Sequence, residues 1–373
     1  MGPLAGLRVI EMEAIGPLLH AGMLLADLSA DVIRVTRPST GAAEDGVDDA
    51  NTGMLRGRTQ VGLNLKTAAD LELFLELVAG ADVLLEGLRP GAMEGLGLGP
   101  EDCQKVNPSL VYGRMSGWGQ TGPMAAFAGH DINYLALAGA LDPMGPADSP
   151  PLPPLNYVGN FGGGSMFLLF GVMVALQERT RTGRGQVVDA AMVDGASSLT
   201  SLLRSWQHAG RWSAERGTNL LDGSAPFYRV YACTDGKHMA VGALEATFYD
   251  RFVEGLGLAA AKMPDRWDRD SWPTLTETLA TTFASRTRDE WTDVFSGIDA
   301  CVTPVLTLAE SLQHPHAVAR SAFVEIHGMA MPAPAPRLSG SRSEPRPLTL
   351  GDAAEVAAAW CAASPRGLDA DHD

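Results

Sequence analysis

The sequence predicts an α/β fold, with a parallel sheet of Rossmann type in a large domain and a smaller α+β domain. Three observations support this prediction. Strand-like apolar runs alternate with helix-like segments up to Gly119, and the pattern changes to antiparallel strand-like runs near Ser224. In addition, 46% of the 373 residues are hydrophobic, which is enough for a substantial core.

The parallel sheet is predicted from the first third of the chain. A helix that begins behind Gly16 and Pro17 connects the first two strands, and a second helix precedes the third. The strand-like runs are LRVIEM (7–12), DVIRVTRP (31–38), DVLLEG (82–87) and LVYGRMSGWG (110–119). Ligands bind beyond the carboxyl ends of the strands in such sheets, so we expect a site at that edge.

The middle of the chain contains a glycine run in front of a long apolar segment, PPLNYVGNFGGGSMFLLFGVMVAL (153–176). Its pattern predicts a long helix from about Gly163 to Arg179, followed by a turn, a strand and another helix.

The smaller domain is predicted from APFYRVYACTDGKHMAVGAL, where Asp235-Gly236 forms a hairpin turn between antiparallel strands. Helices up to Ser296 complete it. The Pro/Ser-rich segment 328–347 is expected to run extended over a surface.

Composition excludes several classes of protein. The chain has 44 acidic and 28 basic residues, a net charge of −16, so its field repels nucleic acids, and an anionic ligand must be held by local arginines and backbone amides. The four cysteines form no CxxC pair and the histidines show no metal-ligand spacing, so we expect reduced thiols and no metal. The N-terminus lacks the features of a signal peptide, and the apolar run 166–176 is too short for a bilayer span, which predicts a soluble, cytoplasmic protein.

Several long blocks resemble the class III CoA-transferase family of CaiB/BaiF type, most closely its α-methylacyl-CoA racemase branch. They span Leu4 to about Pro347 in the expected order: GPLLHAGMLLADLSADVIRVTRP, LRPGAMEGLGLGPE, YGRMSGWGQTGP, AGHDINYLALAG, GNFGGGSMFLLFGVMVALQERTRTGRGQVVDAAMVDG and CVTPVL. The resemblance implies an interlocked homodimer in which the Rossmann-like large domain is built from both chain ends.

This resemblance fixes the expected domain boundaries. The N-terminal part of the large domain comprises 1–200, a linker 201–223, and the small α+β domain 224–310. A return linker and the C-terminal part of the large domain comprise 311–365, and 366–373 is a loose tail.

The resemblance also implies the catalytic residues. His130 matches the family's catalytic histidine, Asp131 follows it directly, and Glu245 matches the small-domain carboxylate that supports the imidazole. A racemase must remove a weakly acidic proton beside a thioester, and an imidazole exists in both protonation states near neutral pH. From the residues alone, a helix-capping His-Asp pair is the alternative.

Asn160 stands where the family's motif GDFGGGSMF has an aspartate. That aspartate is the second base of the racemases and the nucleophile of the CoA-transferring members, and an amide performs neither task. We therefore predict no CoA transfer. Asn160 caps the following helix, donates to a substrate oxygen, or replaces a natural aspartate by design.

Two further sets of residues are expected to bind the substrate. The glycines Gly162, Gly163 and Gly164 are predicted to open a helix whose free N–H groups bind the thioester oxygen, unless they only permit tight packing. The basic residues expected to bind the coenzyme A moiety are Arg34, Arg37, Arg58 and Arg89, with Arg56 and Lys66 in the same block as Arg58.

The predicted function is that of a racemase or epimerase acting on 2-methylacyl-CoA thioesters, with coenzyme A as part of the substrate and no separate cofactor. One alternative is a single-base relative that catalyses isomerisation, elimination or cyclisation on a CoA-like or carrier-protein thioester. Another is a non-catalytic acyl-CoA-binding homologue, which would have no need of His130, Asp131 and Glu245.

Overall fold

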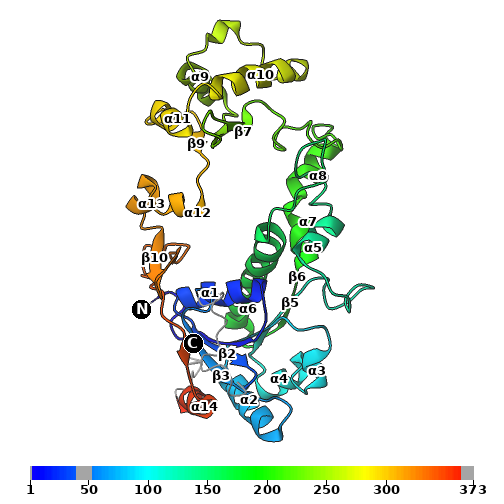
Figure 1. Ribbon diagram of the computed structural model, residues 1–373. Coiled ribbons are helices and arrows are strands. Elements are labelled where there is room, and N and C mark those ends of the chain that lie inside the picture. The colour runs from blue at the N-terminus through cyan, green and yellow to red at the C-terminus, as the bar shows by residue number, and fades with distance from the viewer. Residues whose placement is uncertain (1, 39–52, 363–373) are drawn as a thin grey trace, which may run out of the picture. The chain divides into compact units, whose positions relative to one another are not determined.

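The computed structural model describes residues 2–38 and 53–362, and the chain divides into two compact units (Figure 1). Unit 1 comprises residues 1–138, 155–199 and 318–373, and unit 2 comprises 139–154 and 200–317. The segment predicted as a linker, 201–223, falls in unit 2, as does the loop 139–154. The predicted tail, 366–373, lies outside the described residues.

Unit 1 is built on a parallel sheet that, in the described part of the chain, has seven strands in the order β12-β3-β2-β1-β4-β5-β6. The strands are β1 (Arg8–Met12), β2 (Asp31–Thr36), β3 (Arg58–Gly62), β4 (Val83–Glu86), β5 (Val111–Ser116), β6 (Val187–Ala191) and β12 (Thr349–Leu350). The central strand β1 pairs with β2 and β4 in parallel register. The prediction of a parallel α/β sheet is confirmed, and β3 and β12 are strands that it did not include.

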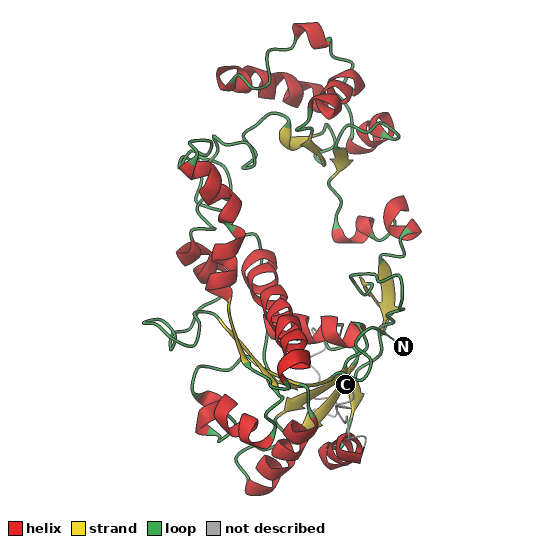
Figure 2. Cartoon of the chain, turned by 180° about the vertical axis from the view of Figure 1, so that it is seen from behind, coloured by secondary structure: helices red, strands yellow, loops and turns green. Residues whose placement is uncertain are grey.

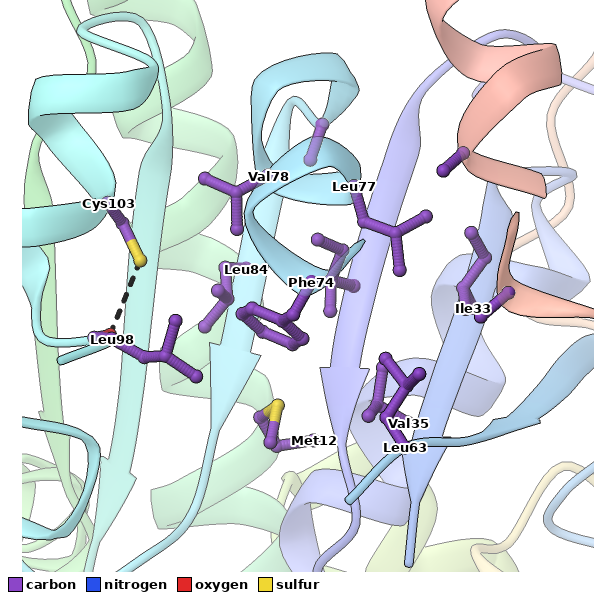
Figure 3. Packing of buried hydrophobic residues seen from close by; sticks show 14 of the residues in the cluster. Met12, Ile33, Val35, Leu63, Phe74, Leu77, Val78, Leu84, Leu98 and Cys103 are labelled. Atoms are coloured by element: carbon purple, nitrogen blue, oxygen red, sulfur yellow. Dashed lines mark hydrogen bonds between the residues drawn. The ribbon is translucent and has the colours of Figure 1, made fainter. Parts of the chain in front are cut away.

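Helices cover both faces of this sheet (Figure 2). Successive strand residues point to opposite faces, so Val9 packs with Leu168 on one face. Ile33 packs with Phe74 and Leu77 on the other face (Figure 3). Apolar residues on both sides of a strand are typical of a buried parallel sheet.

Two helix ends of unit 1 show caps that the sequence supplies. The Thr67 side chain caps α2 by accepting from the Asp70 N–H, and Gly183, with a φ of 68°, ends α6 in the left-handed region. The helices are α1 (Pro17–Asp27), α2 (Ala68–Gly80), α3 (Ala92–Gly95), α4 (Pro100–Val106), α5 (Asp131–Ala138), α6 (Met166–Thr182), α7 (Met192–Leu199) and α14 (Ala353–Ala362). The strands β10 (Phe323–Ile326) and β11 (Met329–Pro332) form a separate hairpin.

The glycine run lies inside a helix. A π-helix, η2 (Tyr157–Ser165), continues directly into α6, so the helical stretch begins at Tyr157 and not at Gly163. The whole stretch has 26 residues, and an 18-residue window within it has a mean hydropathy of 1.5, which is long and apolar enough to cross a membrane and differs from our estimate for the run 166–176 alone. Leu168 and Val172 are nevertheless buried in the cluster beside β5, the setting of a core helix, and core helices share this length and composition.

Unit 2 has an antiparallel sheet of three strands in the order β7-β8-β9 among the described residues. Its elements are α8 (Ser201–His208), β7 (Tyr228–Ala232), β8 (His238–Gly242), α9 (Ala246–Gly255), η3 (Ala260–Lys262), η4 (Arg269–Ser271), α10 (Trp272–Phe283), α11 (Arg288–Phe295), β9 (Val302–Pro304) and α12 (Leu308–Ser311). A short helix, α13 (Pro315–Ala319), contains the boundary between the units. The predicted hairpin at Asp235-Gly236 joins β7 to β8.

Candidate active site

A cavity of about 1110 Å³ opens in unit 1 beyond the carboxyl ends of the strands. Its wall includes Met12 at the end of β1, Thr36 at the end of β2 and Ser116 at the end of β5. The N-terminal turn of α1 contributes Gly16 and Pro17. The cavity therefore lies at the sheet edge where parallel α/β folds bind ligands, and its size suits a small-molecule ligand.

His130 lines this cavity with an exposed side chain. Its backbone is held in place, because its N–H donates to the Asn133 Oδ1 atom at 3.0 Å and its carbonyl accepts from the N–H groups of Asn133 and Tyr134. Within the described ranges, no side chain is hydrogen-bonded to the imidazole ring. The structure thus presents an anchored histidine whose ring is free to meet a ligand.

Asp131 is buried beside the cavity wall and does not face the predicted catalytic site. Its side chain is 8% exposed and does not line the cavity, and its Oδ2 atom accepts from the backbone N–H of Asn160 at 2.5 Å. Burial raises the pKa of this carboxyl, while hydrogen bonds from the Asn160 and Gly159 N–H groups oppose the rise. We therefore correct its predicted catalytic part: Asp131 anchors the helix that carries Asn160.

Asn160 lines the same cavity as His130, on the π-helix η2. Its backbone N–H is bonded to Asp131, and its amide nitrogen lies beside Gly16, where an added Cβ would come within 3.4 Å of Nδ2. The structure thus brings together the histidine and the amide that the sequence singled out.

The prediction for the three glycines is wrong in its geometry. Gly162, Gly163 and Gly164 lie within η2 and do not line the cavity, so they are not the free N-terminal donors of a helix. A Cβ on Gly163 would lie 2.8 Å from the Ala196 nitrogen, and one on Gly164 would meet Met192 and Pro17 at 3.0 and 3.2 Å. The alternative, tight packing, accounts for the glycines. The helix that begins beside His130 is α5, and the N–H groups of Asn133 and Tyr134 in its first turn donate to the His130 carbonyl.

Three basic residues form an exposed rim on the cavity: Arg37 after β2, Lys66 after β3 and Arg89 after β4. Arg34 also contacts the cavity but is only 7% exposed, and it donates to Gln60 at 2.8 Å and lies 3.5 Å from Glu13. Among the described residues, no ion pair engages the side chains of the three rim residues.

Arg58 does not belong to this set. It is 1% exposed, does not line the cavity, and its guanidinium donates to Glu11 at 2.8 Å and to the carbonyls of Leu19 and Met54. We correct its predicted part in coenzyme binding, because its guanidinium contacts lie inside the protein, with Glu11, Met54 and Leu19. The counter-charge on Glu11 lies 47 residues away in the chain, where no local pattern connects the two.

Glu245 lies in unit 2, at the N-terminal cap of α9, with an exposed side chain that caps no backbone N–H. Glu245 is not among the residues of unit 1 that line the cavity. Lys66, named with the block of Arg58, lines the cavity. Thr36 and Ser116 are cavity residues that the sequence-based set omitted; both end a strand, and a position at a strand end is the signal that had singled out Arg37 and Arg89.

Comparisons with known proteins agree on one family. The model of CoA-transferase family III matches residues 4–350. Proteins of Mus musculus and Homo sapiens described as alpha-methylacyl-CoA racemase are 44% and 43% identical, each over 92% of this chain and 88% of the relative. A CAIB/BAIF family protein from Brucella suis has the same fold, with a TM-score of 0.79 and 24% identity over 97% of this chain and 99% of that one.

Proposed function

The chain belongs to CoA-transferase family III, and on that premise we propose that it is a racemase or epimerase of 2-methylacyl-CoA thioesters. The observation that carries the proposal is that His130 and Asn160 line one cavity whose rim is formed by Arg37, Lys66 and Arg89. Three exposed cations thus lie together at this cavity in a chain with a net charge of −16, and guanidinium and ammonium groups suit the phosphates of coenzyme A.

In the proposed reaction the neutral His130 imidazole removes the proton from the carbon beside the thioester carbonyl. The electron pair of the broken C–H bond moves onto the thioester oxygen, and an enolate forms. The first turn of α1 lines the same cavity, and backbone N–H groups at a helix N-terminus stabilise such a charge. Return of a proton to either face of the enolate carbon restores the thioester.

Asn160 is the reason why we do not propose CoA transfer for this enzyme. A CoA-transferase that works through an acyl-enzyme anhydride needs a carboxylate nucleophile at this position, and an amide forms no anhydride. The amide supplies two N–H donors instead, in a cavity that Asn160 lines together with His130. We propose that it holds a substrate oxygen by donation.

The same residue favours a second candidate, a single-base relative. Without a carboxylate at position 160, His130 acts as the one base, which forms the enolate and returns the proton to the same face. The family resemblance assigns Glu245 the support of the imidazole, and this assignment is part of the proposal in both schemes. The interlocked homodimer, the cytoplasmic location and the absence of a separate cofactor belong to this proposal.

Deuterium incorporation separates the candidates. A single enantiomer of a 2-methylacyl-CoA is incubated with the enzyme in D₂O, and both deuterium content and configuration are followed. Deuterium uptake with loss of configuration supports racemisation, and uptake with retention supports the single-base enzyme. If the wild-type enzyme incorporates no deuterium and His130→Ala binds the thioester as tightly as wild type, the protein only binds acyl-CoA.

Changing Asn160 to Asp tests the part of the amide. A carboxylate at this place supplies a second proton-transfer group, so we expect racemisation to rise by about 10²-fold. Asn160→Ala is the matched control, since it removes the amide without adding a base. A rise in Asn160→Ala as large as in Asn160→Asp would contradict the proposed part of the second base.

A further inference from the structure

We infer that His20 is a positioning residue: through Ser165 and Phe161 it holds the π-helix that presents Asn160 to the cavity. The inference deepens the proposed function and rests on it. Neither His20 nor Ser165 lines the cavity, so both act through Asn160 and not on the substrate.

The contacts tie two distant segments together. The His20 Nδ1 atom lies 2.7 Å from the Ser165 Oγ atom, across 145 positions of sequence. The imidazole also stacks on Phe161, the residue after Asn160, with ring centroids 4.5 Å apart and planes inclined by 28°. Ser165 is fully buried, so this hydrogen bond has no competition from water at the hydroxyl.

The donor of this bond follows from a count of protons. Ser165 has one hydroxyl proton, and its Oγ donates to the carbonyl of Phe161 at 3.0 Å. The contact with His20 then requires Nδ1–H to donate to Oγ. Burial lowers the pKa of His20, Arg56 lowers it further, and Asp27 opposes them, so the neutral ring with its proton on Nδ1 is favoured.

The π-helix needs an external support. Wide turns of this kind are uncommon and occur mostly at functional sites, and Gly162, Gly163 and Gly164 supply no side chains to hold one. The Asn160 N–H is bonded outside the helix, to Asp131. The carbonyl of Phe161 accepts from both Met166 N–H and Ser165 Oγ, so the Ser165–His20 pair reinforces the turn immediately after Asn160.

Helix α1 supplies this support from one face. Gly16 and His20 are four residues apart and therefore lie one turn apart on the same side of a helix. Gly16 lies against the Asn160 amide, Pro17 against Gly164, and His20 holds Ser165. The end of α1 that forms a cavity wall thus also fixes the position of Asn160.

The test compares three side chains at position 20. His20→Phe keeps a ring for stacking and removes the Nδ1–H donor, whereas His20→Asn restores an N–H donor near the Nδ1 position. Because small misplacements of a reacting group are costly, we expect kcat to fall about tenfold or more in His20→Phe with KM for the acyl-CoA changed less than about twofold. His20→Asn should recover most of kcat. A rise in KM at constant kcat, or His20→Asn no better than His20→Phe, would overturn the inference.

A second variant and a readout without substrate complete the test. Ser165→Ala removes the other half of the pair, and the double variant with His20→Phe should be no slower than either single variant. Hydrogen exchange of the backbone amides in 157–165, followed by mass spectrometry, should accelerate in His20→Phe and Ser165→Ala and not in His20→Asn. The amide-exchange measurement needs no substrate, so it tests His20 even if the wild-type enzyme does not exchange the α-proton of an acyl-CoA, a result that would refute the proposed function alone. Amide exchange that is unchanged in all three variants would refute the part of His20.

Discussion

Unit 1 uses the same residue type in two opposite ways, and the contrast shows what makes an arginine available to a ligand. Arg56 and Arg58 are buried, each 1% exposed. Arg56 donates to Asp27 and Arg58 donates to Glu11. Arg37 and Arg89 stand exposed on the rim of the cavity. The two pairs differ because a buried carboxylate accepts hydrogen bonds from each inner arginine, Arg56 and Arg58. The guanidinium donors of the outer pair, Arg37 and Arg89, are available to a phosphate.

Arg34 shares features with both pairs, because it lines the cavity like the outer arginines and is buried like the inner ones. It touches the cavity, yet Gln60, Glu11 and Glu13 surround it, and its buried Nε atom, 3.9 Å from Glu11 Oε1, has no hydrogen-bond partner in the described part of the structure. We expect it to shape the floor beneath the rim more than to carry a phosphate.

The largest effect should come from breaking an inner pair. Arg58→Met removes the cation that is hydrogen-bonded to Glu11 and leaves this carboxylate, which has no exposed surface, with Arg34 at 3.9 Å. The loss of a hydrogen-bonded partner costs a buried carboxylate about 3–5 kcal/mol. Urea denaturation followed by circular dichroism measures this loss. Arg37→Met serves as the surface control and should stay within about 0.5 kcal/mol of wild type. Equal stability of the two variants would erase the distinction between inner and outer arginines.

The outer pair should show the reverse pattern. A charge-assisted hydrogen bond is worth about 1.5–3 kcal/mol, so Arg37→Ala and Arg89→Ala should each raise KM for the acyl-CoA by roughly tenfold at nearly constant kcat. A pantetheine thioester that lacks the nucleotide provides the comparison, because it has no phosphates for the rim to hold. Should both substrates lose affinity alike, the rim would not be the phosphate site.

The smallest effect is a pH dependence that links the inner pair to His20. The pKa of His20 is lowered from 6.5, chiefly by burial and then by Arg56, so the folded protein binds fewer protons than the unfolded chain just below that pH. Its contribution to stability is therefore present above pH 6.5 and is lost as the pH falls toward the lower folded-state pKa. His20→Phe should remove this part of the acid dependence in thermal melts recorded from pH 7.5 to 5.0. An unchanged profile would mean that the imidazole is not protected from protonation.

Much of this architecture could be predicted from the sequence, because it depends on local pattern. Apolar strands alternating with helices predict the parallel sheet, and positions just after strands predict that Arg37 and Arg89 lie at its edge. The errors concern long-range information. Nothing near Arg58 indicates Glu11, nothing in GGG shows that the helix already began at Tyr157, and the stacking of His20 on Phe161 joins segments that share no pattern.

Strand β12 shows the same limit from the other end of the chain. It has two residues, Thr349 and Leu350, which is too short for any periodicity, and its place beside β3 depends on the sheet already formed. The segment 328–347 before it was predicted as extended over a surface; it contains β11, which pairs with the preceding strand β10 in a hairpin.

The position of β12 has a consequence for biosynthesis. Residues of β3 leave the ribosome early, but the strand and helix that cover that edge, β12 and α14, are translated only after the whole of unit 2. Meanwhile the nascent sheet carries an open border with unpaired backbone groups, and the apolar pocket that receives Trp360 stays vacant. A premature stop codon between unit 2 and Thr349 would make that transient state permanent, leaving a product prone to join other chains edge to edge.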